Sequence, residues 1–240
     1  MKISLNMITM DRTPKENYIK DTIMSLKKGG VFDSNILGAF NILVSNQNSD
    51  FLNFIELDSV NIVIPEEAKN GNENYASAVL QGYKDNCDYI MLIEDDISVC
   101  AKFLESTVKW LEERFVNTDY SLAAIYSPYE QCNICLKGNI NYWDYPIPAF
   151  YGTQCVVIRP EDAVNLYEYL LDTDSKLTGA YKGKGWDLIM AKFYKKKYPD
   201  RANFITCCPS FVQHTGDDSV IDTLNFHKSP SFKGENWSYV

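Results

Sequence analysis

The chain has 240 residues, of which 45% are hydrophobic, and its 32 acidic and 23 basic residues give a formal charge of −9. The length and apolar content predict one large domain with a sizeable core, and the negative charge argues against duplex nucleic acid as a partner. No apolar run reaches the about 18 residues of a membrane span, and the N-terminus becomes polar too soon for a signal peptide. The seven cysteines follow no framework spacing, so we expect free thiols in a reducing cytoplasm.

The first part of the chain alternates apolar runs with helical patterns. Residues 3–10 read as a buried strand, and Thr13 and Glu16 have the spacing of a capping box that starts a helix. Gly29 and Gly30 are expected to end that helix. Further strands are expected at residues 36–46, 60–64 and 88–93, with a helix over 72–86.

The rest of the chain continues this alternation, which is typical of an α/β fold with a mostly parallel central sheet flanked by helices. The spacing of apolar residues predicts helices over 101–115, 161–172 and 186–197, and strands at 121–127, 154–158 and 203–208. Cys132 and Cys135 form a lone CxxC motif. Because no second pair lies nearby and the chain has only two His, we expect no structural zinc site there.

Three adjacent carboxylates, Glu94, Asp95 and Asp96, follow the strand at 88–93. They stand at the carboxyl end of a strand, where open α/β sheets bind ligands. Adjacent carboxylates raise one another's pKa unless a cation neutralises them, and Mn²⁺ or Mg²⁺ can do this while bridging to a diphosphate. The alternation of strand side chains predicts that Glu94 and Asp96 point the same way, with Asp95 opposite. The alternative is a plain polar turn in which Asp96 or Ser98 caps a helix.

Several segments resemble the N-acetylglucosaminyltransferase IV family. The longest is ENYASAVLQGYKDNCDYIMLIEDDISVCAKFLESTVKWLEE, and GKGWDLIMAKF and CCPSFVQHTGDDS resemble later parts of that family. In patches the resemblance covers about residues 72–219, and SLNMITMDR is similar to the start of other nucleotide-sugar enzymes. It implies a GT-A-like (Rossmann-like) domain that acts as an inverting, metal-dependent glycosyltransferase. The chain is shorter than that family, so its donor and acceptor are not carried over.

Glycosyl transfer from a nucleotide sugar gives the candidate residues definite roles. Asp96, Glu94 and His214 are the candidate metal ligands, and an imidazole favours Mn²⁺ over Mg²⁺. The alternative for His214 is a packed side chain in a loop. Asp187 is the candidate base for the acceptor hydroxyl, and the alternative is that it only caps the following helix. Should Asp187 not be the base, Asp217, Asp218 and Glu94 are the next candidates.

Other residues are expected to bind the donor and the acceptor. The candidates for the nucleotide sugar are Thr9, Asp11, Arg12, Tyr75, Asp95, Gly152, Thr153 and Gln154. Trp186 is expected to stack on an acceptor sugar, or else to anchor its helix. Arg12 is alternatively a surface charge, Tyr75 a core residue, and Gly152 part of an ordinary turn.

The whole chain, 1–240, is thus expected to be one glycosyltransferase domain. Residues 1–96 form the nucleotide-sugar half, 97–219 the acceptor and catalytic half, and 220–240 a tail or lid. The expected partners are a nucleoside-diphosphate sugar, with UDP as the favoured nucleotide, and a saccharide or glycan. The alternatives are a sugar-phosphate nucleotidylyltransferase, whose glycine-rich basic loop is missing from TMDRTPKEN, and a binding module without turnover.

Overall fold

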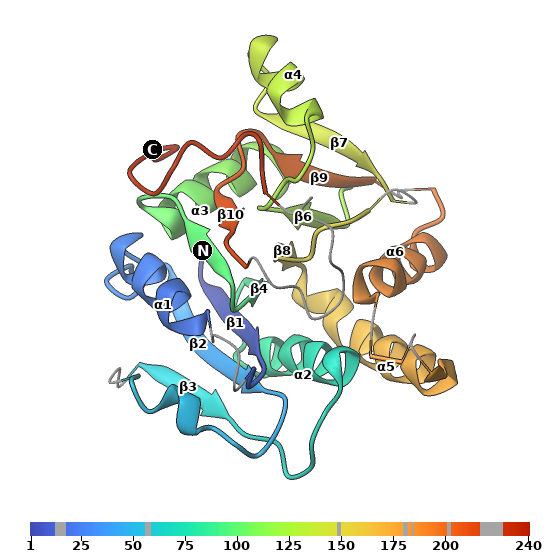
Figure 1. The fold of residues 1–240 in the computed structure, drawn as a ribbon. Coiled ribbons are helices and arrows are strands. Elements are labelled where there is room, and N and C mark those ends of the chain that lie inside the picture. The colour runs from blue at the N-terminus through green and yellow to red at the C-terminus, as the bar shows by residue number, and fades with distance from the viewer. Residues whose placement is uncertain are drawn as a thin grey trace.

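The computed structural model describes residues 1–12, 18–55, 59–147, 150–179, 182–183, 185–200, 203–216 and 228–240. Its centre is an eight-stranded sheet with the strand order β3-β2-β1-β4-β8-β6-β9-β7 (Figure 1). The strands are β1 (Ile3–Thr9), β2 (Leu37–Val44), β3 (Val60–Val63), β4 (Tyr89–Glu94), β6 (Leu122–Ala124), β7 (Tyr142–Pro146), β8 (Cys155–Ile158) and β9 (Asn203–Cys207).

The first four strands of the chain pair in parallel, in the order typical of a dinucleotide-binding half. Strand β8 runs antiparallel between β4 and β6, β6 and β9 pair in parallel, and β7 is an antiparallel edge strand. The α/β class and the mostly parallel central sheet are therefore confirmed.

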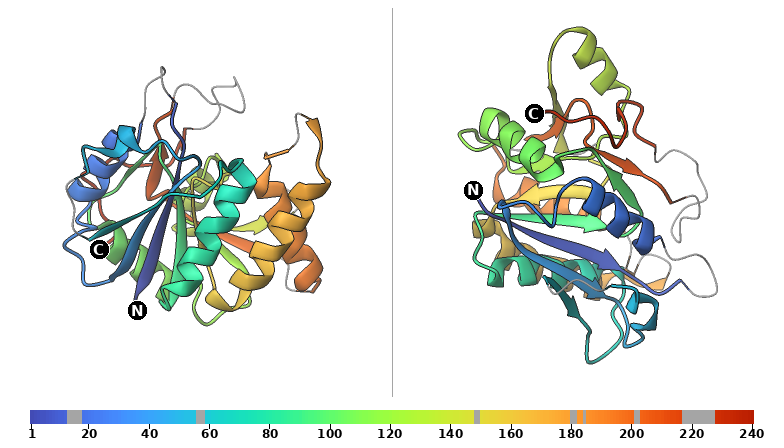
Figure 2. Two further views of the ribbon diagram at one scale, coloured as in Figure 1. Left: turned by 90° about the horizontal axis from the view of Figure 1, so that it is seen from below. Right: turned by 90° about the vertical axis from the view of Figure 1, so that its left-hand side faces the viewer.

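Two helical layers cover this sheet (Figure 2). The helices are α1 (Ile19–Lys28), α2 (Gly71–Lys84), α3 (Phe103–Arg114), α4 (Gln131–Lys137), α5 (Pro160–Lys176) and α6 (Trp186–Lys197), with a 3₁₀ turn η1 at Asp50–Leu52. Helices α1 and α3 bury their apolar sides against one face, and α2, α5 and α6 lie along the other. A strand buried on both faces needs continuous apolar sequence, which is why these strands read as unbroken runs.

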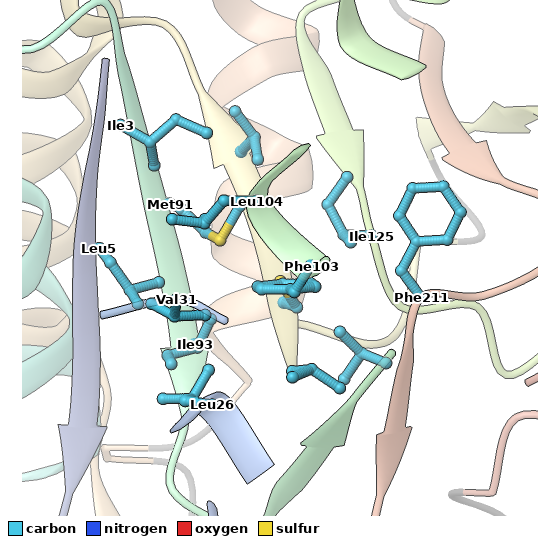
Figure 3. Packing of buried hydrophobic residues seen from close by; sticks show 14 of the residues in the cluster. Ile3, Leu5, Leu26, Val31, Met91, Ile93, Phe103, Leu104, Ile125 and Phe211 are labelled. Carbon is cyan, nitrogen blue, oxygen red and sulfur yellow. The ribbon is translucent and has the colours of Figure 1, made fainter. Parts of the chain in front are cut away.

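The core under α1 and α3 shows how the alternation of strand side chains is used. Ile3 and Leu5 of β1 and Met91 and Ile93 of β4 point to this face, and they pack with Leu26 and with side chains of α3 (Figure 3). The C-terminal residues 228–240 also run along this layer. The backbone N–H of Ala101 donates to the carbonyl of Trp237 at 2.8 Å, so the end of the chain is held beside α3.

The predicted helices and strands agree with the structure except for five short elements. The sequence analysis missed η1, α4, β7 and a separate antiparallel pair, β5 (Ile97–Val99) and β10 (Val212–His214). Each strand of that pair has three residues, too few to show a period. The capping box at Thr13 and Glu16 lies outside the described residues. Among the described residues, no helix has the length and apolarity needed to cross a membrane.

Candidate functional site

The carboxyl ends of β1 and β4 lie side by side near the middle of the sheet, because the two strands pair in parallel with Ile8 opposite Glu94. Strands β2 and β3 follow β1 on one side of it in the sheet, and the chain then crosses to β4, which lies on the other side of β1. Such a reversal of strand order is the place where open α/β sheets bind their ligands. The residues that follow β1 and β4 therefore meet at one place.

Three potential ligand atoms converge just beyond the end of β4. One atom each from Glu94, Asp96 and His214 lie within 4.8 Å of one another. Nε2 of His214 lies 3.2 Å from Oδ2 of Asp96, and both side chains are buried. Oδ1 of Asp96 is buried as well and has no hydrogen-bond partner among the described residues. Two carboxylates and one imidazole form a donor set that fits a divalent cation such as Mn²⁺.

The small antiparallel sheet brings His214 to the acidic cluster. Strand β5 follows directly after Asp96 and pairs with β10, so that Ile97 lies opposite His214. The N–H of Thr215 then donates to the carbonyl of Asp96 at 2.8 Å. Gly216 passes so close that a Cβ there would lie 2.7 Å from Oδ2 of Asp96. The sequence analysis did not single out Gly216, although a glycine two residues after a candidate ligand was visible in the sequence.

The charges of this cluster shift the pKa values of its members. Burial and the neighbouring Asp96 raise the pKa of Glu94 to about 8. Burial also raises the pKa of Asp96, but the hydrogen bond and charge of His214 and the charge of Arg12 outweigh it, so the pKa lies below its ordinary value. Burial lowers the pKa of His214, but the hydrogen bond to Asp96 outweighs burial and raises it. An added positive charge, as protons or as a cation, would therefore stabilise the cluster.

Asp95 is not part of this group and binds Arg12 instead. Two guanidinium nitrogens of Arg12 donate to the two carboxylate oxygens of Asp95, each at 2.8 Å. The hydroxyl of Thr9 donates to the same carboxylate, and Asp95 is only 2% exposed. The structure thus brings Thr9, Arg12 and Asp95 together as one bonded unit between the ends of β1 and β4. Arg12 is therefore not a plain surface charge. Its guanidinium pairs with the buried Asp95, and its second nitrogen also lies 3.7 Å from Oδ2 of Asp96.

The segment before β8 lies beside the same strand end, since β8 runs antiparallel to β4. The N–H of Glu94 donates to the carbonyl of Gln154 at 3.1 Å, and the hydroxyl of Thr153 donates to Oε1 of Glu94 at 3.2 Å. Oε1 of Gln154 is buried without a hydrogen-bond partner among the described residues. Gly152 has a φ of +107°, which favours glycine. The segment from Gly152 to Gln154 thus lies beside the end of β4, and its binding of a nucleotide sugar stays a prediction.

Trp186 and Tyr75 connect the acidic cluster to the start of α6. Nε1 of Trp186 donates to the hydroxyl of Thr153, which in turn binds Glu94. The Trp186 ring stacks on Tyr75 with centroids 5.1 Å apart. Tyr75 is fully buried, yet its hydroxyl has no hydrogen-bond partner among the described residues. Trp186 therefore anchors α6 at the site, and its stacking on an acceptor sugar stays a prediction.

Asp187 is half-buried in the first turn of α6, directly after Trp186. Its Oδ1 accepts the N–H of Leu188 at 2.8 Å, but the N-cap residue of the helix is Gly185 and no side chain caps it. Burial raises the pKa of Asp187 above its ordinary value. The charge of Asp187 is in turn among the smaller causes that raise the pKa values of Tyr75 and Tyr145. The role of Asp187 as a base stays a prediction.

A carboxylate that no sequence motif indicated holds the loop before α6. Oδ1 of Asp174 accepts from the side-chain amide of Asn72 at 2.6 Å and from the N–H of Gly183 at 2.8 Å. Its other oxygen accepts from Asn70 at 2.8 Å. Gly183 has a φ of +76°, and a Cβ on Gly71 would lie 2.7 Å from the Gly183 carbonyl. The backbone at Gly183 therefore packs closely against the start of α2 at Gly71.

Two further groups of predicted residues have different outcomes. Asp11 accepts a hydrogen bond from Nδ2 of Asn48 at 2.7 Å, in the loop region after β1 and β2, and its role with a nucleotide stays a prediction. Asp217 and Asp218 lie outside the described residues. Asn74, which the sequence analysis did not name, donates to the carbonyls of Thr9 and Leu43 and ties α2 to the ends of β1 and β2.

Comparison with known proteins gives a distant structural likeness. No protein-family profile and no curated protein matches this chain. Among the solved structures that match, the galactosyltransferase LgtC in complex with donor and acceptor sugar analogs is 14% identical, with a TM-score of 0.49. The match covers 88% of this chain and 86% of that chain. The sequence resemblance to the N-acetylglucosaminyltransferase IV family finds no support in these comparisons, so the residues described above carry the proposal that follows.

Proposed function

We propose that this protein is a GT-A-like, inverting, metal-dependent glycosyltransferase. It would move a sugar from a nucleoside-diphosphate sugar, with a UDP-sugar as the expected donor, to a hydroxyl of a saccharide. The observation that carries the proposal is the convergence of Glu94, Asp96 and His214 at the neighbouring ends of β1 and β4. Ligands of open α/β sheets bind at that place, and the donor set fits a hard divalent cation.

A divalent cation bound there would stabilise the leaving diphosphate as a Lewis acid. Asp96 and His214 would hold the cation, and the buried Oδ1 of Asp96 is an acceptor atom without another described partner. Thr153 orients Glu94 through the hydroxyl that donates to Oε1. The His ligand favours Mn²⁺ over Mg²⁺.

The residues around the three candidate metal ligands would bind the donor. Both oxygens of Asp95 accept from Arg12, so Asp95 orients the guanidinium and is not itself available as a metal ligand. The guanidinium lies beside Asp96, where a diphosphate would lie, and Arg forms strong bidentate bonds with phosphate. Oε1 of Gln154 is a buried acceptor suited to a hydroxyl of the transferred sugar.

Asp187 would take the proton of the acceptor hydroxyl. An inverting transfer needs its base on the face of the sugar opposite the leaving diphosphate. Asp187 directly follows Trp186, whose indole is bonded through Thr153 to Glu94, and this connection supports a position of the base on the acceptor side of the cluster. Burial raises the pKa of Asp187, which makes the carboxylate a stronger base.

The experiment that tests the proposal is a thermal-shift screen of nucleotide sugars with and without Mn²⁺. A donor at ~100 times its Kd should stabilise the fold by about 2.7 kcal/mol. Asp96→Ala should lose the Mn²⁺-dependent part of the shift. Asp172→Ala, which removes an exposed carboxylate on α5, should keep it. If no nucleotide sugar stabilises the protein with Mn²⁺, or if Asp96→Ala responds as the parent does, the proposal is wrong.

The product separates the proposed activity from its alternatives. A glycosyltransferase releases a nucleoside diphosphate when an acceptor is added, whereas a nucleotidylyltransferase releases pyrophosphate from a nucleoside triphosphate and a sugar phosphate. A binding module releases neither. Chromatography of the nucleotides after incubation with mixed saccharide acceptors therefore decides among the three.

A further inference from the structure

Three cysteine thiols from two distant parts of the chain converge beside α4. Cys132 and Cys135 lie on α4, and Cys208 follows the end of β9. The thiol of Cys208 lies within hydrogen-bonding reach of both Cys132 and Cys135. The CxxC motif that the sequence shows as a lone pair thus has a third thiol as its neighbour.

The backbone holds these thiols together independently of the side chains. The N–H of Cys208 donates to the carbonyl of Asn141 at 2.9 Å, and the N–H of Ile140 donates to the carbonyl of Cys135 at 2.8 Å. Ile140 and Asn141 are adjacent, so Cys135 and Cys208 are both bonded to the same short piece of chain. The antiparallel pairing of β7 with β9 begins at the next residue pair, Tyr142 with Cys207, and fixes this arrangement.

The three thiols differ in their access to solvent. Cys132 is fully buried, where it lies 2.8 Å from the hydroxyl of Ser127 and donates to the carbonyl of Cys207 at 3.6 Å. Cys208 is 1% exposed, while Cys135 is half-buried. A reagent from solution therefore reaches Cys135 first among the three thiols.

We propose that Cys135 and Cys208 are a reversible redox pair that forms a disulfide by exchange with a small disulfide such as oxidised glutathione. The Cys135 thiolate attacks one glutathione sulfur, breaks the glutathione S–S bond and releases one glutathione thiolate. The Cys208 thiolate then attacks Sγ of Cys135, forms the protein disulfide and releases the second glutathione. Two protein thiols lose two electrons and two protons, and one glutathione disulfide becomes two thiols.

This bond would connect α4 to the segment between β9 and β10, which leads to His214. The disulfide would therefore join an outer helix of the molecule to the chain that holds a candidate metal ligand. It does not depend on the proposed activity, since it rests on the three thiols alone.

The full chain is incubated at pH 8.5 in glutathione buffers of increasing oxidised fraction, then alkylated and digested without reduction. Burial raises the pKa of Cys135, so an alkaline pH is used to populate its thiolate. We expect mass spectrometry to find a peptide that joins Cys135 to Cys208, so that these two thiols escape alkylation. Reduction with dithiothreitol should restore both.

Variants decide which thiols take part. Cys208→Ser should leave Cys135 as a mixed disulfide with glutathione, Cys135→Ser should keep Cys208 reduced, and Cys132→Ser should still form the Cys135–Cys208 bond. Cys87 is also half-buried and should stop at the mixed disulfide, which makes it the internal control for access. A disulfide of Cys132 with either Cys135 or Cys208 overturns the proposal, and so does a parent protein that stops at the mixed disulfide on Cys135. The absence of any oxidation at Cys135 while Cys87 reacts overturns it as well.

Discussion

Nε2 of His214 lies 3.2 Å from Oδ2 of Asp96, although the two residues lie far apart in the sequence. His214 belongs to β10, and Asp96 directly precedes β5, the strand that pairs with β10. The contact joins the chain after β4 to the chain after β9. Each residue shifts the pKa of the other toward the charged form. A site that gathers a carboxylate and an imidazole in this way can exchange a proton for a metal ion.

The first prediction concerns His214→Ala. If His214 is a ligand, the variant should need at least about tenfold more Mn²⁺ for half-maximal activity, because the cation loses one of its protein ligands. Excess Mn²⁺ should restore part of the rate, since Asp96 and Glu94 remain. The measurement is the initial rate against Mn²⁺ concentration. An unchanged half-saturating concentration would make His214 a packing residue.

Both partners of this contact were identified from the sequence, but the reason for their contact was not. Three adjacent carboxylates after an apolar strand are a strong local pattern. The prediction that Glu94 and Asp96 point the same way agrees with the closeness of their carboxylate oxygens, although Asp96 lies beyond the end of β4. The approach of His214 depends on β5 and β10, whose length is too short for any periodicity to appear. Pairing between such strands is decided by the packing around them, which a local pattern does not contain.

The second prediction concerns the buried pair of Arg12 and Asp95. Arg12→Met should lower the free energy of unfolding by about 3 kcal/mol, because it leaves a buried carboxylate with Thr9 as its remaining described side-chain partner. Chemical denaturation in the presence of a chelator measures this loss without a contribution from metal binding.

The matched control is the double variant Arg12→Met with Asp95→Asn. It removes the charge together with its partner, so it should recover a large part of the lost stability. If Arg12→Met alone unfolds at the parent denaturant concentration, Arg12 and Asp95 are not coupled in the folded protein.

The same pair shows a limit of local sequence patterns. Arg12 follows β1 in a polar stretch where a charged residue reads equally as a surface group. Its burial follows from the parallel pairing of β1 with β4, which places Asp95 within reach of its guanidinium. Asp174 is a stronger case, since its three partners come from α2 and from the loop before α6, and no spacing in the sequence relates them.

The third prediction is that the metal-free protein loses stability as the pH rises between about 5 and 8.5. The pKa of Glu94 is raised from 4.5 to about 8, so the folded state keeps a proton that the unfolded chain releases above about 4.5. The raised pKa of His214 acts in the same direction, because the folded protein loses the stabilising proton of His214 as the pH rises through this raised pKa. The lowered pKa of Asp96 matters only at more acidic pH.

Thermal unfolding in a chelator across this range gives the test. The midpoint should fall as the pH rises, and Glu94→Gln should flatten the slope because the amide does not titrate. Saturating Mn²⁺ should reduce the slope as well, since a cation favours the ionised carboxylate. A midpoint that rises with pH in the chelator, or an unchanged slope in Glu94→Gln, contradicts the assigned pKa of Glu94.

The last prediction separates binding from chemistry at Asp187. The diphosphate would be held by the acidic cluster and Arg12, so Asp187→Asn should bind the nucleotide sugar about as well as the parent. An amide does not accept the proton of the acceptor hydroxyl, so the rate should fall by ~10²-fold or more with donor affinity little changed. The amide oxygen can still accept the N–H of Leu188, which keeps the first turn of α6 in place. A loss of rate with an unchanged unfolding midpoint is therefore a loss of chemistry.

Asp172→Asn on the surface of α5 is the matched control for Asp187→Asn and should keep the parent rate. If Asp187→Asn turns over acceptor at the parent rate, the base is another carboxylate. Glu94 is then the next residue to change, because Trp186 at the start of α6 is bonded through Thr153 to it.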